Sequence, residues 1–270
     1  MATNNFAGLI NSSTIIDLSL TLSEDLPCWW PSAVRYRQTN DNWFEDADGP
    51  TPLRRRTGGA YRTNALELDE HTGTHFDAPS HFIPPPYSGL PYAGPAGAIT
   101  CDRVELTQLI GTAAVIDVRT LVGTSGPGTS PRIEPTHVTE WETEHGRLEP
   151  GEIVLFFSGW DERYLPGEAG KDYVENPFVF RSTPAWPAPT PSTIELLLGR
   201  GIRCVGTDGV SMGSAEDGGP THVVGLSAGM VYVEALCHLD AVPARGALFL
   251  FLPIKLGGGS GGPGRAVAVV

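Results

Sequence analysis

Residues that interrupt regular secondary structure are frequent in this sequence, and they limit the folds that it can adopt. Its 270 residues contain 33 glycines and 24 prolines, which divide the chain into short pieces. Proline breaks helix interiors and glycine weakens them, whereas several of the pieces are rich in the β-branched and aromatic residues that suit strands. The pattern therefore predicts one mixed α/β domain over residues 1–270 that is dominated by strands and has few helices.

Individual elements follow from composition, period and turn residues. The segments expected to form strands are 14–19, 61–69, 113–118, 152–158, 202–208, 230–236, 247–254 and 265–270. Those with helical spacing are 103–110, 136–145 and 190–201, and Thr190 or Ser192 is the expected N-cap of the last. Turn-rich loops are expected at 83–97, 182–191 and 214–220, and the glycine-rich stretch 257–264 is interpreted as a loop inside the domain.

Charge narrows the range of partners. The formal net charge is −13, so nucleic acid and anionic membrane surfaces would repel the chain. The basic cluster LRRRTGG at 53–59 is interpreted as a solvated loop, with specific anion binding as the alternative. The start of the chain lacks the features of a secretory signal, and the apolar run at 247–256 is too short to cross a bilayer. We therefore expect a soluble, cytoplasmic protein.

The four cysteines are predicted to be buried free thiols. They lie far apart in the sequence, form no C-x2-C pair and stand mostly beside apolar residues. This spacing does not match a cysteine zinc site, and a cytoplasmic chain would keep its thiols reduced. They are Cys28, Cys101, Cys204 and Cys237.

An unusual concentration of potential metal ligands occurs in the stretch HTGTHFDAPSH at 71–81. Gly73 and Pro79 make a helix there improbable, so an extended backbone is expected instead. Along a strand, residues of the same parity project to one face. Four candidate ligands share that parity: His71, His75, Asp77 and His81.

Imidazole and carboxylate groups on one short face suit a borderline divalent cation such as zinc or manganese. Three fixed ligands leave a coordination position for water, and a divalent cation lowers the pKa of that water from about 15.7 toward about 7. The alternative is that these are unrelated polar residues of a loop. Four such groups in register favour the metal site.

Two further ligands are offered by the stretch THVVGLSAGMVYVEAL at 221–236, namely His222 and Glu234. Glu234 lies inside an otherwise apolar strand pattern, where an unpaired charge would be costly. A salt bridge to an arginine is one possible partner. A metal cation is the partner that the neighbouring pattern favours.

The same stretch contains a competing motif, Gly225-Leu-Ser-Ala-Gly229, which matches the G-x-S-x-G turn of α/β-hydrolases. That mechanism needs an acid and then a histidine downstream of Ser227, yet the last histidine, His238, precedes Asp240. The stretch 123–130 resembles a phosphate-binding loop, but Thr129 stands where lysine is required. Neither motif is favoured.

Aromatic residues near these motifs are candidates for the wall of a pocket. Trp30 precedes a proline in a loop, next to Trp29, and Phe82 adjoins His81. Trp160 belongs to the same group of candidates. A position in the core is the alternative for each of them.

The pattern H-x-G-T-H-x-D-x-P-x-H resembles the signature of the cyclase family, which includes bacterial kynurenine formamidase and isatin hydrolase. The stretches TIIDLSLTLSEDLPCWWP, IVLFFSGWDERY and IRCVGTDGVSMG, and the closing segment from residue 243, are also similar to that family. The resemblance implies a swivelling β/β/α-type fold with a central mixed sheet or barrel-like core and few peripheral helices. It also implies a homodimer or homotetramer.

Carried onto this chain, the resemblance implies a two-metal site in which Asp77 bridges the ions. The ligands would be His71, His75, Asp77, His222 and Glu234. His81 corresponds to the catalytic acid/base, and its imidazole, with an ordinary pKa of about 6.5, would suit proton transfer at neutral pH. Trp30, with Trp29 as the second choice, corresponds to a substrate-stacking residue, and Phe82 is expected to contact substrate as well.

The function implied is metal-dependent hydrolysis of a non-peptide C–N bond in a small aromatic substrate, as in a kynurenine formamidase (arylformamidase). The alternatives are hydrolysis of a lactam, as in isatin hydrolase, and a natural-product cyclisation or dehydration with the metal as Lewis acid. A non-catalytic metal-containing binding module is the fourth reading. The arginine-rich stretch before the motif and the proline-rich segment after it depart from the compact formamidases, and we expect them to reshape the pocket.

Overall fold

The computed structural model describes residues 12–44 and 61–270. The arginine-rich stretch 53–59, for which a solvated loop is expected, lies outside the described residues. The strands are β1 (Ile15–Asp17), β2 (Arg37–Trp43), β3 (Arg62–Glu67), β4 (His75–Asp77), β5 (Ile110–Asp117), β6 (Arg132–Ile133), β7 (Ile153–Phe157), β8 (Ala188–Pro189), β9 (Cys204–Thr207), β10 (Val231–Glu234), β11 (Arg245–Pro253) and β12 (Gly261–Val269). The helices of at least nine residues are α2 (Pro135–His145), α3 (Pro191–Gly199) and α4 (Gly219–Ser227).

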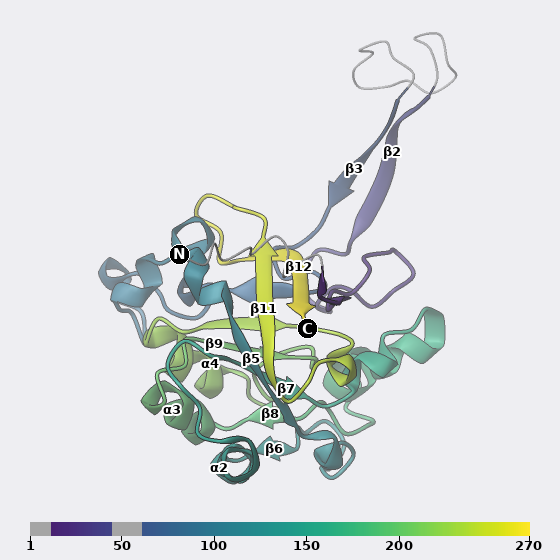
Figure 1. Cartoon of the computed structure of the whole chain (residues 1–270). Coiled ribbons are helices and arrows are strands. Elements are labelled where there is room, and N and C mark those ends of the chain that lie inside the picture. Colours follow the sequence, from purple (N-terminus) through teal and green to yellow (C-terminus); the bar gives the residue numbers. More distant parts are fainter. Residues whose placement is uncertain (1–11, 45–60) are drawn as a thin grey trace.

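A closed sheet forms the centre of the molecule (Figure 1). The strand order is β1-β12-β11-β5-β7-β9-β10-β4, and a further pairing of β4 with β12 closes the ring, with β1 attached outside it. The successive pairs from β5 through β10 are parallel, and β4, β11 and β12 pair antiparallel with their neighbours. The prediction of a mixed sheet with a barrel-like core is therefore confirmed.

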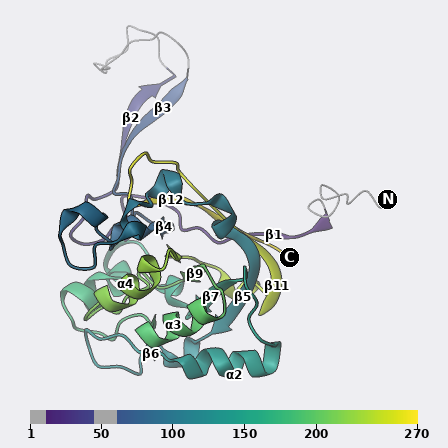
Figure 2. The same ribbon diagram turned by 90° about the vertical axis from the view of Figure 1, so that its left-hand side faces the viewer.

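Alternate residues of the central strands supply two separate cores, as the two faces of a pleated strand require. Along β7, Leu155 packs in one apolar cluster with Val115 and Val233, which lie on neighbouring strands of the ring. Val154 and Phe156 pack in a second cluster that includes residues of α2, α3 and α4. The three helices gather on one side of the sheet (Figures 1 and 2). Because both faces are covered, every residue of β7 is buried.

The helix predictions were partly right. The segments 136–145 and 190–201 correspond to α2 and α3, and the Thr190 hydroxyl accepts a hydrogen bond from the Thr193 N–H as the predicted N-cap. The segment 103–110 is not one helix, because two 3-10 turns, Cys101–Arg103 and Leu106–Leu109, lead into β5. Helix α4 was not predicted, since its residues have the composition of a strand followed by a turn.

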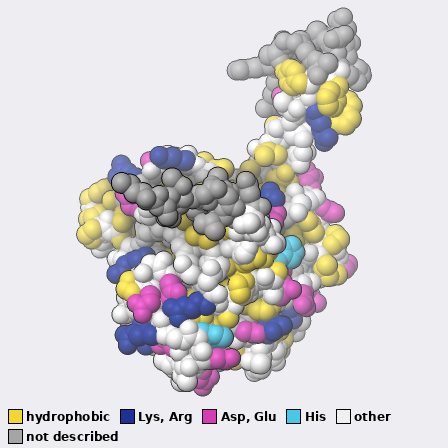
Figure 3. All heavy atoms as spheres, in the orientation of Figure 1, with side chains coloured by type: hydrophobic (Ala, Val, Ile, Leu, Met, Phe, Trp, Pro, Cys, Tyr) yellow, Lys and Arg dark blue, Asp and Glu magenta, His cyan; other side chains and the backbone are white. Residues whose placement is uncertain are grey.

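Strands β2 and β3 form an antiparallel hairpin that projects from the body of the molecule (Figures 1 and 3). The sequence predicted β3 but not β2, whose residues RQTNDNW are mostly polar and show no apolar alternation. The hairpin exposes apolar side chains, including Trp43 and Phe44. Its two ends lead directly to the segments around residues 30 and 70.

The glycine-rich stretch 257–264 was predicted to be a loop, but its second half is the start of β12. Gly261 lies opposite Asp77 in the pairing that closes the ring. A Cβ atom at Gly261 would lie 2.5 Å from the Phe76 carbonyl oxygen and 2.6 Å from Cε1 of His71. The strands approach this closely only because residue 261 has no side chain.

All four cysteines are buried and free, as predicted. No helix in the described part of the chain is both long and apolar enough to cross a membrane.

Replacing Gly261 with alanine tests the closure of the ring. The added methyl group must displace either the backbone of β4 or the ring of His71, and such overpacking costs about 1–3 kcal/mol. We expect a lower unfolding temperature by thermal circular dichroism, by roughly 2–4 °C per kcal/mol. Gly257→Ala is the matched control, because a Cβ atom at Gly257 would have no other atom within 4 Å. Equal unfolding temperatures for both variants would contradict this account.

Candidate metal centre

The motif at 71–81 turns sharply instead of forming one strand. Only His75–Asp77 is extended as β4, and Gly73 adopts the left-handed conformation with φ +62°. A Cβ atom at Gly73 would also collide with the side chain of Leu22. His71 therefore reaches the site from the turn before β4, and His81 reaches it from a 3-10 turn, Pro79–His81. The prediction of a single strand with four ligands on one face was wrong, although the side chains still converge.

Strand pairing brings Glu234 to the motif. In the antiparallel pair of β10 and β4, Glu234 lies opposite His75, and Tyr232 lies opposite Asp77. Side chains of directly opposed residues lie close together. His75 Nε2 is 3.4 Å from Glu234 Oε2. This juxtaposition explains how a glutamate in an apolar strand finds a partner without an arginine.

Helix α4 supplies His222. The ring of His222 stacks on Phe82, with centroids 4.2 Å apart and an interplanar angle of 11°. Its Nδ1 lies 2.7 Å from the Gly218 carbonyl oxygen, and His75 Nδ1 lies 2.8 Å from the Gly73 carbonyl oxygen. Because a carbonyl only accepts, each ring donates from Nδ1 and turns Nε2 toward the carboxylates. This is the orientation in which histidine serves as a metal ligand.

The distances among these groups fit a shared cation better than direct hydrogen bonds. His75 Nε2 lies 3.6 Å from Asp77 Oδ1, and His222 Nε2 lies 3.5 Å from Asp77 Oδ2 and 3.3 Å from Glu234 Oε1. Good N–H···O hydrogen bonds are shorter, about 2.7–3.2 Å. Two ligands at about 2.1 Å from a tetrahedral ion are separated by about 3.4 Å. All of these side chains are at least nine-tenths buried.

The Oδ2 atom of Asp77 is buried without a hydrogen-bond partner in the described structure. Asp77 is only 1% exposed, so this oxygen needs a positive partner. Burial alone would raise the pKa of Asp77, but the charge of His81 and the polar contacts of His222 and His71 hold it well below its usual range. Asp77 is thus held as a carboxylate in the interior.

The buried imidazoles compensate this negative charge. Burial lowers the pKa of His222, but the neighbouring carboxylates of Asp77 and Glu234 outweigh burial and raise it to about 10. The pKa of His75 is raised for the same reason, against burial, by Glu234 and Asp77. A cation bound between these groups would replace the protons, because metal ligands must be deprotonated.

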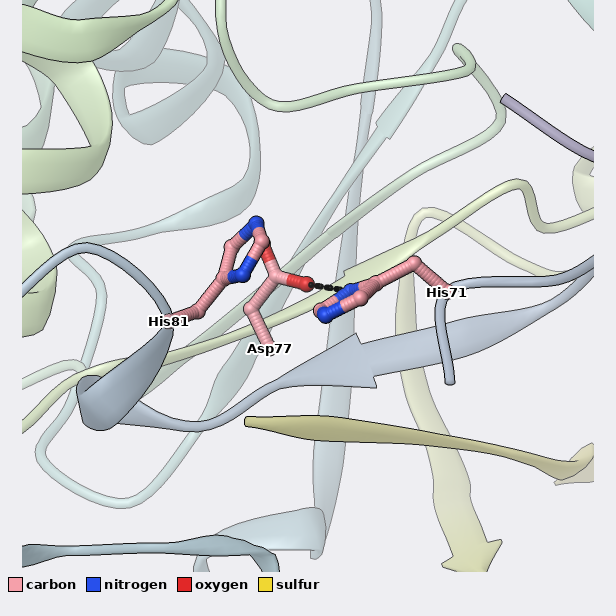
Figure 4. A group of neighbouring side chains, drawn as sticks. All are labelled: His71, Asp77 and His81. Carbon is pink, nitrogen blue, oxygen red and sulfur yellow. Dashed lines mark hydrogen bonds and ion pairs between the residues drawn. The ribbon is translucent and has the colours of Figure 1, made fainter. Parts of the chain in front are cut away.

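A second group of candidate ligands contains His71, Asp77 and His81 (Figure 4). His71 Nδ1 lies 2.9 Å from Asp77 Oδ1, and the His71 and His81 rings lie 4.0 Å apart. The first group contains His75, Asp77 and Glu234, so Asp77 is common to both. Desolvation lowers the pKa of His81 to about 4, against the opposing charge of Asp77. His81 is therefore neutral at pH 7, instead of titrating near 6.5 as the sequence suggested.

These ligand groups lie at a cavity of about 410 Å³. Trp29, Trp30 and Phe82, which the sequence suggested as candidate substrate contacts, all line it. Trp30 packs on Phe178 with ring centroids 4.4 Å apart. Trp160 does not line the cavity, because it is 1% exposed in the core and donates its indole N–H to the Tyr173 carbonyl oxygen.

Several residues of the cavity were not predicted from the sequence. Asp69, Tyr173, Val174 and Val210 line it, although no spacing pattern marks them. Of these, only Asp69 could have been suspected from the sequence, because it lies two residues before the motif. Ser227, the nucleophile of the competing hydrolase motif, is exposed at the end of α4, where its hydroxyl donates to the Val224 carbonyl oxygen. The G-x-S-x-G match is therefore part of a helix and not a strand-to-helix turn.

The barrel and the buried cluster define a candidate metal-dependent enzyme, and comparisons with known proteins agree. A family model described as putative cyclase matches residues 16–214. The chain is 33% identical over 230 residues to the isatin hydrolase of Roseibium aggregatum, covering 83% of this chain and 78% of that protein. It is 29% identical over 264 residues to the kynurenine formamidase of Salinibacter ruber, covering 94% and 96%.

Solved structures show the same relationship. An isatin hydrolase bound to the product analogue thioisatinate has a TM-score of 0.76 and 26% identity, covering 100% of this chain and 99% of that chain. Isatin hydrolase A from Ralstonia solanacearum has a TM-score of 0.75 and 29% identity, covering 98% and 95%. This chain belongs to the Cyclase family, as its motif suggested.

Asp77→Asn tests whether the cluster binds a divalent cation. The amide cannot supply the negative charge that offsets the ion, so we expect affinity to fall by more than the roughly 10–100-fold that loss of a supporting partner costs. Isothermal titration with Zn²⁺ and Mn²⁺ measures this change. Asp240→Asn, which alters an exposed carboxylate outside the cluster, is the control. Unchanged affinity in Asp77→Asn would rule out Asp77 as a ligand.

Proposed function

We propose that this chain is a metal-dependent hydrolase that cleaves a non-peptide carbon–nitrogen bond, an amide or cyclic amide, in a small aromatic substrate. The observation that supports this proposal most is the position of the ligand cluster, which borders a cavity also walled by Trp29, Trp30 and Phe82. Catalytic metal sites keep a position open to water or substrate, whereas structural sites are closed by protein ligands. A purely structural cation would not need that access.

The proposed cofactor is zinc or manganese, with two ions per chain. Both metals accept imidazole and carboxylate ligands. Asp77 belongs to both ligand groups, which supports a bridging role, and His71, His75, His222 and Glu234 complete them. When bound, a divalent cation lowers the pKa of coordinated water and polarises a carbonyl oxygen.

His81 is proposed to move the proton. Its ring lies beside His71 at the cavity, and its lowered pKa keeps one nitrogen free as an acceptor at neutral pH. It can accept a proton as water adds to the carbonyl and then donate that proton to the departing nitrogen. Its membership of a ligand group with His71 and Asp77 makes metal binding the alternative role.

Trp29, Trp30 and Phe82 are proposed to hold an aromatic ring next to the bond that is cleaved. Planar side chains provide large apolar contact areas and stacking surfaces for such a ring. A cyclic amide would correspond to the isatin hydrolase relatives and an aryl formamide to the kynurenine formamidase relatives. The higher identity to the Roseibium isatin hydrolase favours the cyclic amide.

A metal-loaded activity screen tests the function. We expect hydrolysis of isatin or of an N-formyl arylamine such as N-formylkynurenine by protein loaded with Mn²⁺ or Zn²⁺, followed by absorbance. Chelation should abolish activity and added metal should restore it, because the metal supplies the activated water. A metal-replete protein that hydrolyses no aryl amide, lactam or formamide would instead support a cyclase, a dehydratase or a binding module.

His81→Ala separates proton transfer from metal binding. Loss of a general acid/base slows turnover by a factor on the order of 10²–10⁴. We expect that reduction in kcat with an unchanged metal content, measured by elemental analysis of the same sample. Loss of metal together with activity would assign His81 as a ligand.

A further inference from the structure

We propose that Ser260 is a positioning residue for the candidate metal ligand His71, and that Glu70 in turn holds Ser260 in place. This inference rests on the proposed function, because it concerns the orientation of the second group of candidate ligands. Ser260 carries the only side chain in the run GGGSGG at 257–262. The fold brings this serine beside His71, which lies 189 positions away in the sequence.

The ring of His71 is oriented differently from the other candidate imidazole ligands. His75 and His222 each direct Nδ1 to a backbone carbonyl oxygen and Nε2 to the carboxylates. In His71 the two nitrogens are exchanged. Its Nδ1 lies 2.9 Å from Asp77 Oδ1, and its Nε2 lies 3.0 Å from the Ser260 hydroxyl. The nitrogen that faces the shared carboxylate is therefore Nδ1, and Ser260 supports the ring from the other side.

A hydroxyl suits this position because it both donates and accepts hydrogen bonds. The Asp77 carboxylate only accepts, so the neutral His71 ring donates to it from Nδ1 and accepts from the Ser260 hydroxyl at Nε2. A ligand nitrogen must give up its proton, which then lies on Nε2. Ser260 can accept that proton in a hydrogen bond after rotation of its own hydroxyl. A backbone carbonyl could pair with Nε2 only in the second of these states.

Glu70 fixes the backbone that carries this hydroxyl. Its Oε2 accepts hydrogen bonds from the Ser260 N–H at 2.6 Å and from the Gly261 N–H at 3.0 Å. The Ser260 carbonyl oxygen accepts a further one from the Ala78 N–H at 2.8 Å. Hydrogen bonds to a carboxylate are stronger than those between neutral groups. Because Glu70 directly precedes His71, adjacent residues supply the candidate ligand and the anchor of its support.

The glycines on either side of Ser260 allow this close approach. A Cβ atom at Gly259 would lie 2.8 Å from Glu70 Oε2, and one at Gly261 would lie 2.6 Å from Cε1 of His71. A side chain at either position would push Glu70 or His71 away from Ser260. The chain thus has a side chain at 260 and none at the two flanking positions.

Ser260→Ala removes the hydroxyl and keeps the backbone groups that bond to Glu70 and Ala78. Loss of such a supporting partner lowers metal affinity by roughly 10–100-fold. We expect that loss for the ion bound through His71, and nearly unchanged affinity for the ion bound through His75 and Glu234. Isothermal titration of the full chain with Mn²⁺ measures both.

Ser227→Ala is the matched control, because it removes an exposed hydroxyl at the end of α4. It should leave both affinities unchanged. Wild-type affinities in Ser260→Ala would overturn the proposal. An equal loss of both ions would also overturn it, since that would indicate general damage to the site.

Two substitutions of Glu70 test its part. Glu70→Gln keeps an oxygen that accepts from both backbone N–H groups, whereas Glu70→Ala removes it. We expect the His71 ion to bind more weakly in Glu70→Ala than in Glu70→Gln. Adding Glu70→Ala to Ser260→Ala should cause little further loss, because residues that act through one contact are not additive. Equal losses in the two Glu70 variants, or full additivity, would contradict an action through Ser260.

A measurement on the metal-free chain separates this inference from the proposed function. Long-range ¹H–¹⁵N correlation spectra report the state of each ring nitrogen of His71. We expect Nε2 to be unprotonated in the wild type and its resonance to move in Ser260→Ala, where the hydroxyl no longer donates to it. A wild-type chain that binds no divalent cation would defeat the proposed function. The Nε2 resonance would still decide the contact, and an identical position in both proteins would overturn the role of Ser260.

Discussion

The carboxylate of Asp77, buried among imidazoles, is the interaction on which the rest of the site depends. A charge at 1% exposure is costly unless positive groups surround it, and His71, His75 and His222 approach it from three different elements. His81, His222 and His71 together hold the pKa of Asp77 well below its usual range despite burial. Its Oδ2 atom still lacks a hydrogen-bond partner among the described residues. A divalent cation bound there would give that oxygen a positive partner.

The closed sheet makes this arrangement possible. Strand β4 pairs with β10 on one side and β12 on the other, so the short strand that carries Asp77 is fixed from both sides. A backbone hydrogen bond joins the site to the cavity wall, because the Gly73 N–H donates to the Cys28 carbonyl oxygen at 2.7 Å. That bond holds the loop with Trp29 and Trp30 next to the candidate metal-binding motif. The same contacts of β4 and of the turn before it therefore fix the barrel, the candidate ligands and the cavity wall.

Many of the central strands could be predicted from the sequence, because runs of apolar β-branched residues mark them locally. The apolar β-branched runs at 152–158 and 230–236 correspond to β7 and β10. Prediction failed where a long-range contact decides local structure. Strand β12 begins inside a glycine-rich stretch because Gly261 must pass close to Phe76, and no local pattern reveals that neighbour. The polar strand β2 was missed for lack of an apolar period.

In the candidate site, too, local patterns were predicted and long-range contacts were not. Spacing alone brought His75 and Asp77 into one group, but His71 reaches them through the left-handed turn at Gly73 instead of along a strand. Glu234 was found because a charge in an apolar strand needs a partner. Tyr173 and Val210 were missed because a cavity wall formed by distant segments leaves no local pattern in the sequence.

Anomalous X-ray scattering from crystals grown with Mn²⁺ tests directly whether Asp77 binds a cation. We expect a peak between the side chains, within about 2.0–2.3 Å of Nε2 of His75 and of oxygens of Asp77 and Glu234. A Mn²⁺-loaded crystal with no peak at this position, or with these side chains turned away from one another, would contradict it.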